Sequence, residues 1–290
     1  MKKLLLIIII LTSCQLFFGQ STIDISSESV VVDSNFSHSI GLENSEAIAA
    51  FQFDIVYNGD AVVLSSGHSL SERITNHTIS ASNIDSNTIR VIVYSANNEL
   101  IDIGSGKVVN LNFISQNLPG SYNMTISNIV LSDANGSEVS SSGTNGQVTI
   151  LGPKYNLVTT SIDFGEVPIQ SNPNRSITIS NDGNIDLEIL SYTLAAPFSI
   201  NNTFPITITA GSSTTLTVNI DTSTKQNITK QALFTTSDTD PLRGIQSTSI
   251  TANIYAVNEI YVGSGSGEIG TNVNIPVSIN NMEPFNGFQF

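Results

Sequence analysis

The sequence predicts an all-β protein made of tandem antiparallel β-sandwiches followed by a C-terminal β fragment. Apolar and polar residues alternate in short runs, turn-forming pairs separate the runs, and no apolar pattern of helical period competes with them. The alternating runs are Phe51-x-Phe53-x-Ile55-x-Tyr57, Ile89-x-Val91-x-Val93, Val109-x-Leu111-x-Phe113, Val148-x-Ile150, Ile206-x-Ile208 and Leu216-x-Val218-x-Ile220. The turn signals are Asn58-Gly59, Pro119-Gly120, Asn135-Gly136, Asn145-Gly146, Asp182-Gly183 and Ala210-Gly211. Short strands at this spacing are typical of β-sandwiches.

An internal repeat divides the chain into modules. Laid without gaps, residues 23–53 match residues 260–290 at nine of 31 positions. The identical positions are Ile23/Ile260, Ser27/Ser264, Ser29/Ser266, Asn35/Asn272, Asn44/Asn281, Glu46/Glu283 and Phe51-Gln52-Phe53/Phe288-Gln289-Phe290. We therefore expect residues 257–290 to be a truncated second copy of the first module, in a chain that continues in its natural form. Phe51 and Phe53 are expected to be buried, and their C-terminal counterparts to be poorly packed.

Residues 1–20 have the pattern of an export signal peptide. Two lysines precede an unbroken aliphatic run over residues 4–11, which is too short for a spanning helix of roughly 20 apolar residues. Two processing routes remain open. Cleavage near Gly19/Gln20 resembles the signals of Bacteroidetes-type bacteria, and a lipobox would instead leave Cys14 carrying a lipid anchor. Both routes predict an extracellular or cell-surface protein with no membrane insertion beyond the signal peptide or that anchor.

The composition agrees with export. Cys14 is the only cysteine, so the mature chain has no disulfide framework and no thiolate for catalysis or metal binding. Ten Lys and Arg residues against 24 Asp and Glu residues give a formal net charge of −14, which argues against nucleic acid or an anionic membrane as a partner. We interpret the acidity as solubility of an exposed protein.

The first module, residues 22–151, carries an ordered series of strand motifs. These motifs are Phe51-Gln52-Phe53-Asp54-Ile55-Val56-Tyr57, a strand ending near Val93, Gly104-Ser105-Gly106-Lys107-Val108-Val109-Asn110-Leu111-Asn112-Phe113, Leu131-Ser132-Asp133-Ala134-Asn135-Gly136 and a final Gly146-Gln147-Val148-Thr149-Ile150. The series resembles a cohesin domain, or more loosely the related carbohydrate-binding-module-like sandwiches. The resemblance implies a nine-stranded jelly-roll sandwich whose exposed sheet face binds a partner, usually a dockerin.

The second module, residues 154–255, follows a break at Leu151-Gly152-Pro153. Its motifs are Asp163-Phe164-Gly165-Glu166-Val167, Ser176-Ile177-Thr178-Ile179-Ser180-Asn181-Asp182-Gly183 and Ile206-Thr207-Ile208-Thr209-Ala210-Gly211-Ser212. They resemble the immunoglobulin-like modules of the ASH and major-sperm-protein type, which implies a spacer. We expect Phe164 and the Ile177/Ile179 pair to face one core, and Asp182-Gly183 to form a hairpin turn.

The sequence shows no assembled catalytic motif, so we expect no enzymatic activity. The three histidines, His38, His68 and His77, form no His-x-x-x-His pair. We interpret His38 as an exposed residue on the polar phase of its strand. A pair of catalytic carboxylates far apart in the sequence would escape such a search.

A calcium site is the one cofactor site for which the sequence offers candidates. Asp133, Asn135 and Glu138 supply oxygen ligands beside a turn glycine, as hard-cation loops do. The stretch lacks the full twelve-residue ligand series, however, and Asn135-Gly136 alone accounts for a hairpin. Both interpretations stand at this point.

A partner-binding site is expected near the end of one strand. The chain has no Trp, and its seven Tyr residues lie mostly at strand ends. Tyr94 and the following Asn97, Asn98 and Leu100 are candidates, because by resemblance this strand and loop border the face that cohesins present to dockerins. The alternative is that the strand-end tyrosines only pack against the core.

The sequence thus predicts a non-catalytic, modular, secreted or cell-surface protein. The cohesin-like module would bind a dockerin-like partner or a polysaccharide, and the immunoglobulin-like module would act as a spacer. Two alternatives remain. The chain is a purely structural adhesin or anchoring stalk, or it is the accessory region of a larger secreted enzyme that degrades polysaccharides.

Overall fold

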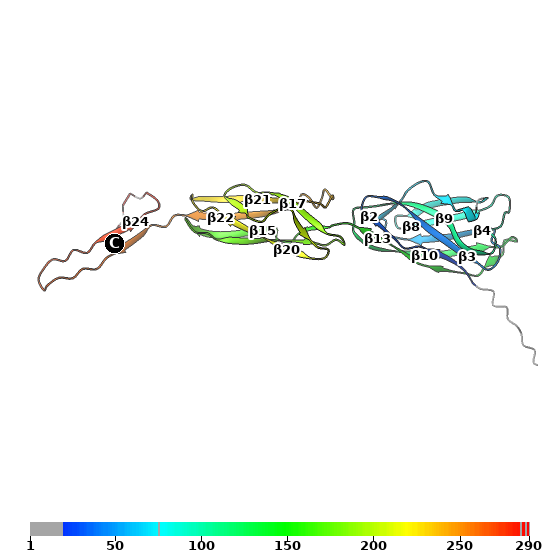
Figure 1. Ribbon diagram of the computed structural model, residues 1–290, viewed down its shortest axis with the longest axis horizontal. Coiled ribbons are helices and arrows are strands. Elements are labelled where there is room, and N and C mark those ends of the chain that lie inside the picture. The colour runs from blue at the N-terminus through cyan, green and yellow to red at the C-terminus, as the bar shows by residue number, and fades with distance from the viewer. Residues whose placement is uncertain (1–19, 75, 285, 288, 290) are drawn as a thin grey trace, which may run out of the picture. The chain divides into compact units, whose positions relative to one another are not determined.

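The computed structural model describes residues 20–74, 76–284, 286, 287 and 289. These residues form strands, loops and a single 3-10 turn, and they divide into two compact units, Met1–Ile150 and Leu151–Phe290 (Figure 1). The predicted all-β class is confirmed. Among the described residues no helix has the length and apolar character needed to cross a membrane. Residues 1–19, which hold nearly all of the predicted signal peptide and Cys14, lie outside the described residues, as do Phe288 and Phe290.

The first unit is a sandwich of two sheets. One is six-stranded in the order β12-β1-β3-β9-β5, with β6 also pairing with β9, and the other is seven-stranded in the order β2-β13-β10-β4-β8-β7, with β11 also pairing with β10. The elements are β1 (Ser21–Ile25), β2 (Glu28–Val31), β3 (Asn35–Asn44), β4 (Ala50–Val56), β5 (Val62–Leu64), β6 (Ser69–Leu70), η1 (Glu72–Ile74), β7 (Thr78–Asp85), β8 (Thr88–Tyr94), β9 (Gly104–Ser115), β10 (Gly120–Ser132), β11 (Glu138–Val139), β12 (Ser141–Thr144) and β13 (Gly146–Leu151).

Strand β4 lies in the middle of the seven-stranded sheet and supplies much of the core. Because side chains alternate along a strand, Phe51, Phe53 and Ile55 point into the sandwich, and all three are buried. Phe51 and Phe53 stack with ring centroids 6.2 Å apart. The predicted burial of these two phenylalanines is confirmed. The residues between them, Gln52 and Asp54, belong to the opposite face of the sheet.

The terminal strands of this sandwich move from one sheet to the other. The chain leaves β12 in the six-stranded sheet and enters β13 in the seven-stranded sheet across Asn145-Gly146, which therefore connects two sheets and makes no hairpin. A Cβ atom at Gly146 would lie 2.2 Å from the Ser26 carbonyl oxygen, so only glycine fits this approach. Strand β12 pairs with β1 in parallel, a departure from the antiparallel pairing expected throughout.

The expectation of an exposed His38 is wrong. His38 has the same parity as Phe36 and Ile40, so it points inward from β3 and is fully buried opposite Leu111 of β9. Phe36 and Phe113 contact the imidazole edge-on, at centroid distances of 6.3 Å and 6.4 Å. Burial lowers the pKa of His38, and the Ser26 backbone and the Glu28 charge oppose that shift only in part.

The second unit contains an immunoglobulin-like sandwich and a C-terminal hairpin. The sandwich has a four-stranded sheet in the order β14-β16-β20-β18 and a five-stranded sheet in the order β15-β22-β21-β17-β19, with β15 and β22 parallel. The strands are β14 (Tyr155–Leu157), β15 (Ser161–Pro168), β16 (Asn174–Asn181), β17 (Leu187–Thr193), β18 (Phe198–Ile200), β19 (Ile206–Ile208), β20 (Ser213–Ile220), β21 (Gln226–Thr236), β22 (Ser247–Tyr255), β23 (Glu259–Val262) and β24 (Val277–Asn280).

The core of this sandwich confirms one prediction, and a loop beside it contradicts another. Phe164, Ile177 and Ile179 are buried in one cluster, as expected. Asp182-Gly183 forms no hairpin turn, because β16 and the next strand, β17, belong to different sheets. The buried Asn181 side chain fixes this crossing by donating to the carbonyl oxygens of Ile185 and Ile208 and accepting from Gly183 N.

The C-terminal hairpin repeats the pairing of β1 with β3 residue for residue. In the first unit Ile23 lies opposite Leu42, and in the hairpin Ile260 lies opposite Ile279, at the same offset of 237 positions. The hydrogen bond from Ser26 N to Ser39 O also recurs, between Gly263 N and Pro276 O. The two segments thus share a register as well as sequence identities.

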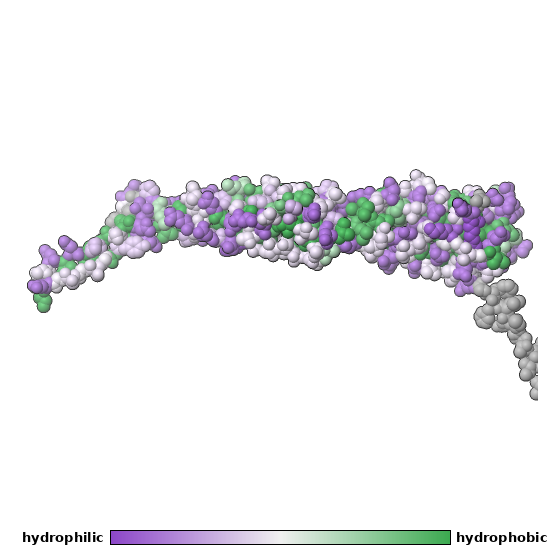
Figure 2. Space-filling view, viewed as in Figure 1, coloured by the Kyte–Doolittle hydropathy of each residue, from purple (hydrophilic) through white to green (hydrophobic). Residues whose placement is uncertain are grey.

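The hairpin differs from its counterpart in burial. Ile23 and Leu42 are fully buried in the first unit, whereas Ile260 is 43% exposed and Val262 is 63% exposed. Apolar side chains therefore show on the surface of this hairpin (Figure 2). An apolar strand pair without a covering sheet is a surface that a folded module would bury.

Burial of a neutral His38 predicts acid sensitivity of the first unit. The unfolded imidazole has an ordinary pKa of about 6.5, so below that pH the unfolded chain binds more protons than the folded one. The contribution of His38 to the free energy of unfolding is therefore fully present above about pH 6.5. As the pH is lowered toward the folded pKa, the free energy of unfolding falls by at most about 1.4 kcal/mol per pH unit. His38→Ile, which introduces the residue found at the repeat position Ile275, should reduce this slope in urea unfolding between pH 5 and 7. A residual slope is expected, because burial also lowers the pKa of His68 and of His77. An unchanged slope would contradict the assignment.

Candidate partner-binding face

The outer face of β10, β4, β8 and β7 is an ordered grid of side chains. Strand register sets four rows across it: Ser132-Ala50-Tyr94-Thr78, Val130-Gln52-Ile92-Ser80, Ser127-Asp54-Arg90-Ser82 and Thr125-Val56-Thr88. These residues are the ones that alternate with the core positions of the same strands. We call this grid the outer face.

An ion pair lies in the third row. Arg90 donates through Nε and one terminal nitrogen to the two carboxylate oxygens of Asp54, each at 2.8 Å. Asn128 Nδ2 donates to Asp54 Oδ2 at 2.7 Å. Asn128 reaches this carboxylate because β10 bulges between Ser127 and Val130, and Asn128 itself has a positive φ of 49°.

Asp54 is a buried carboxylate on the outer face of the sheet, and this network satisfies its charge. The hydrogen bonds from Arg90 hold the pKa of Asp54 below its ordinary value, against the effect of burial, and the Asn128 amide acts in the same direction. A charged Asp54 therefore holds the Arg90 guanidinium in a bidentate pair, which leaves a polar centre in which both carboxylate oxygens accept hydrogen bonds.

Exposed apolar side chains surround this polar centre. Val130 is 46% exposed, Tyr94 44% and Ile92 37%, and Val56 lies on the other side of the ion pair at 43%. Apolar groups on a flat and rigid surface are typical of protein recognition sites. Tyr94 is exposed at the end of its strand, whereas Tyr57 is buried against the core.

The loop after Tyr94 carries the other predicted residues. Ser95 Oγ accepts the backbone N–H groups of Asn97 and Glu99, and the Ile48–Ile101 bridge fixes the far end of the loop. Asn97 and Asn98 are exposed, and Leu100 is 40% exposed. The structure thus places all four predicted partner-binding residues at one end of the outer face, where Tyr94 pairs with Ala50.

The calcium candidates lie in the hairpin between β10 and β11. Asp133 Oδ1 accepts the N–H groups of Asn135 and Ser137 at 2.8 Å each, and these bonds lower the pKa of Asp133, that from Ser137 most. Glu138 lies opposite Ser132 in the strand pair. The geometry accounts for Asp133 as the side chain that closes the turn. Across the residues that the structure describes, no three acidic, His or Cys side chains form a group suited to a metal ion.

Sequence reasoning missed Asp54, Arg90, Ile92 and Val130. Ile92 was open to detection, since it is an apolar residue on the polar phase of the Ile89-x-Val91-x-Val93 run. The pairing of Asp54 with Arg90, and the position of Val130 after a bulge, depend on strand register and leave no signal in the local sequence.

Comparison with protein families identifies both sandwiches. Residues 21–150 match the family model of the cohesin domain. The first unit is a cohesin domain. Residues 153–248 match the model of the HYDIN/CFA65/VesB-like Ig-like domain, so an immunoglobulin-like domain follows the cohesin domain. The search of curated proteins found no match.

Several solved cohesins align with less than half of this chain. A non-cellulosomal cohesin from the archaeon Archaeoglobus fulgidus is 19% identical, with a TM-score of 0.40 over 46% of this chain and 93% of the other. The complex of Coh-OlpA with Doc918 from Clostridium thermocellum gives 14% identity and a TM-score of 0.42 over 46% of this chain and 100% of the other. A cohesin module from a Clostridium perfringens family 33 glycoside hydrolase is 15% identical, with a TM-score of 0.40 over 45% of this chain and 96% of the other.

Removing the Asp54 charge should destabilise the cohesin domain in a pH-dependent way. Asp54→Asn leaves Arg90 without its anion and should cost about 1–3 kcal/mol at pH 7. Because the folded pKa of Asp54 is lowered, its contribution is present above the unfolded pKa of about 3.9 and is lost as the pH falls through the folded value. Urea unfolding should therefore show a smaller difference at pH 3 than at pH 7, and an equal difference at both would count against a charged Asp54.

Proposed function

We propose that the chain is a non-catalytic, modular, exported protein whose cohesin domain binds a dockerin-type module through the outer face. The observation that carries this proposal is the combination of a cohesin match over residues 21–150 with exposed apolar side chains on one rigid sheet. The family match supports the choice of partner class, because a dockerin is the usual partner of a cohesin.

Recognition would rest on a few anchors around a polar centre. Tyr94, Ile92 and Val130 offer apolar area on strands, so little conformational entropy is lost when a partner covers them. The Asp54–Arg90 pair is already satisfied within the domain, which removes the cost of burying an unpaired charge. Arg90 is still accessible at 37% and can donate to an acidic or carbonyl group of the partner.

The immunoglobulin-like domain would serve as a spacer. Its resemblance to spacer modules and its own closed core, from Tyr155 to Ile254, support this role. Export rests on the pattern of residues 1–20, with cleavage near Gly19/Gln20 or a lipid at Cys14 as the two routes. The assignment of the domain to the ASH and major-sperm-protein type, and a Bacteroidetes-type source, also remain proposals.

Residues 257–284 would open a second cohesin-type module. The shared register of the two hairpins supports this proposal, and so does the identity Asn44/Asn281. Asn44 is buried in the first unit, where its amide donates to Glu46 O and Asp102 O. Two such modules on one chain would allow two partners to bind, which raises apparent affinity for a multivalent target.

Loss of the apolar anchors should abolish capture of the partner. Tyr94→Ala combined with Leu100→Ala is expected to weaken binding of a dockerin-type module at least about a hundredfold, since anchor residues contribute about 2 kcal/mol or more each. The measurement is calorimetry of the full chain with a dockerin-type module recovered from the secreted proteins of the source.

A matched control separates recognition from general surface change. Val63→Ala combined with Leu233→Ala removes side chains that are 40% and 38% exposed, close to the 44% of Tyr94 and 40% of Leu100, but away from the outer face. This variant should bind like the unmodified chain. If neither variant changes binding, or if no secreted dockerin-type module binds at all, the chain is better described as a structural stalk or as the accessory region of a larger enzyme.

The repeat hypothesis predicts that one hairpin can replace the other. Residues 258–281 grafted without gaps over residues 21–44 should give a folded cohesin domain with a cooperative thermal transition, because Ile260 and Ile279 take over the core positions of Ile23 and Leu42.

The control graft uses residues 257–280, which shifts the register by one and turns the apolar side chains to the solvent face. It should not fold. Equal behaviour of the two grafts in circular dichroism melting would refute the shared register as the basis of the repeat.

A further inference from the structure

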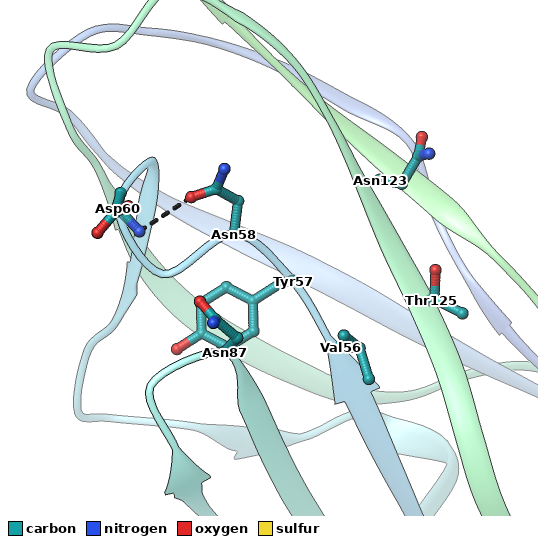
Figure 3. Close-up of a pocket in the computed structure, with 7 residues that line it drawn as sticks. All are labelled: Val56, Tyr57, Asn58, Asp60, Asn87, Asn123 and Thr125. Atoms are coloured by element: carbon teal, nitrogen blue, oxygen red, sulfur yellow. Dashed lines mark hydrogen bonds between the residues drawn. The ribbon is translucent and has the colours of Figure 1, made fainter.

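A polar pocket opens at the end of the outer face opposite Tyr94 (Figure 3). It has a volume of about 430 Å³, within the range of small-ligand sites. The turn after β4, the turn before β8 and strand β10 supply the lining residues, which are Val56, Tyr57, Asn58, Asp60, Asn87, Asn123 and Thr125.

The oxygens of three side-chain amides in this pocket accept hydrogen bonds. Asn58 Oδ1 accepts the backbone N–H of Asp60 at 3.0 Å, and Asn87 Oδ1 accepts that of Gly59 at 3.0 Å. Asn123 Oδ1 accepts from Gln147 Nε2 at 3.2 Å. Since a backbone N–H can only donate, the first two amides must turn their oxygens to the turn and their NH₂ groups away from it. Their donors are left for a ligand.

Other groups in the pocket complement these donors. Asp60 is exposed, and its carboxylate can only accept. Thr125 adds an exposed hydroxyl, and Val56 adds apolar surface at 43% exposure. In Figure 3, Asn58 and Asp60 lie across the pocket from Asn123 and Thr125, with Val56 between them.

The chemistry of the lining disfavours metal ions and anions. A metal ion would need several strong oxygen ligands, whereas the lining offers one carboxylate, Asp60, and the amide oxygens of Asn58 and Asn87 already accept N–H groups of the turns. An anion would meet the Asp60 carboxylate in a chain of net charge −14. The groups that remain suit a neutral ligand with adjacent hydroxyls, each able to donate to a carboxylate and accept from an amide.

We propose that this pocket binds a neutral saccharide. Hydroxyls of one sugar residue would donate to Asp60 and accept from the NH₂ groups of Asn58, Asn87 and Asn123, while Val56 contacts its C–H groups. The Tyr57 ring is buried and its hydroxyl donates to Asn83, so no aromatic ring stacks on the sugar. Binding without stacking is weak, with a Kd on the order of millimolar. The pocket shares Val56 and Thr125 with the outer face, but none of the anchors Tyr94, Ile92 and Val130 lines it.

The test is a titration of the ¹⁵N-labelled full chain followed by NMR. The probes are cellotetraose, xylotetraose, mannotetraose and chitotetraose. At least one probe should shift the side-chain NH₂ signals of Asn58, Asn87 and Asn123 in a saturable way. Asn87→Asp keeps the oxygen that accepts Gly59 N–H but removes the donor, so it should weaken that binding about tenfold.

The control is Asn135→Asp, which adds the same charge to an exposed turn elsewhere in the cohesin domain and should leave the affinity unchanged. The proposal is overturned if no probe shifts the three amide signals, or if Asn87→Asp binds as well as the unmodified chain. It is also overturned if a dockerin-type module, and no sugar, shifts them, since the pocket would then be part of the protein interface.

Discussion

The cohesin domain depends on the register of β4 between β8 and β10. Phe53 lies opposite Val91 on one side, and Ile55 lies opposite Ile126 on the other. A slip of one residue would move Phe51, Phe53 and Ile55 to solvent and bury Asp54 among apolar groups. One pairing therefore fixes both the core and the outer face. The Asp54–Arg90 pair adds specificity, because its geometry exists in a single register.

Local alternation made the fold class and most core positions predictable from the sequence. Turn pairs were less informative. Asn135-Gly136 closes a hairpin, whereas Asn145-Gly146 and Asp182-Gly183 connect two sheets, because a turn signal does not specify which sheet the next strand joins. His38 was misassigned from its residue type, although its parity with Phe36 and the apolar Ile275 at the repeat position both indicate a core site.

The candidate site was predictable only in part. Tyr94 and Leu100 stood out in the sequence, as a strand-end ring and an apolar loop residue. Their neighbours Ile92 and Val130 come together through pairings between strands far apart in the chain and through a bulge at Asn128. The pocket beside Val56 also depends on the strand pairings, because its amides come from the turn after β4, the turn before β8 and strand β10.

The central claim is that the outer face is the surface that binds a partner. Hydroxyl-radical footprinting of the full chain, alone and with a bound dockerin-type module, tests it directly. The account predicts protection of Tyr94, Ile92 and Val130 and unchanged oxidation of Val63, which is exposed on the six-stranded sheet. Protection of Val63 with no change at Tyr94 would contradict it.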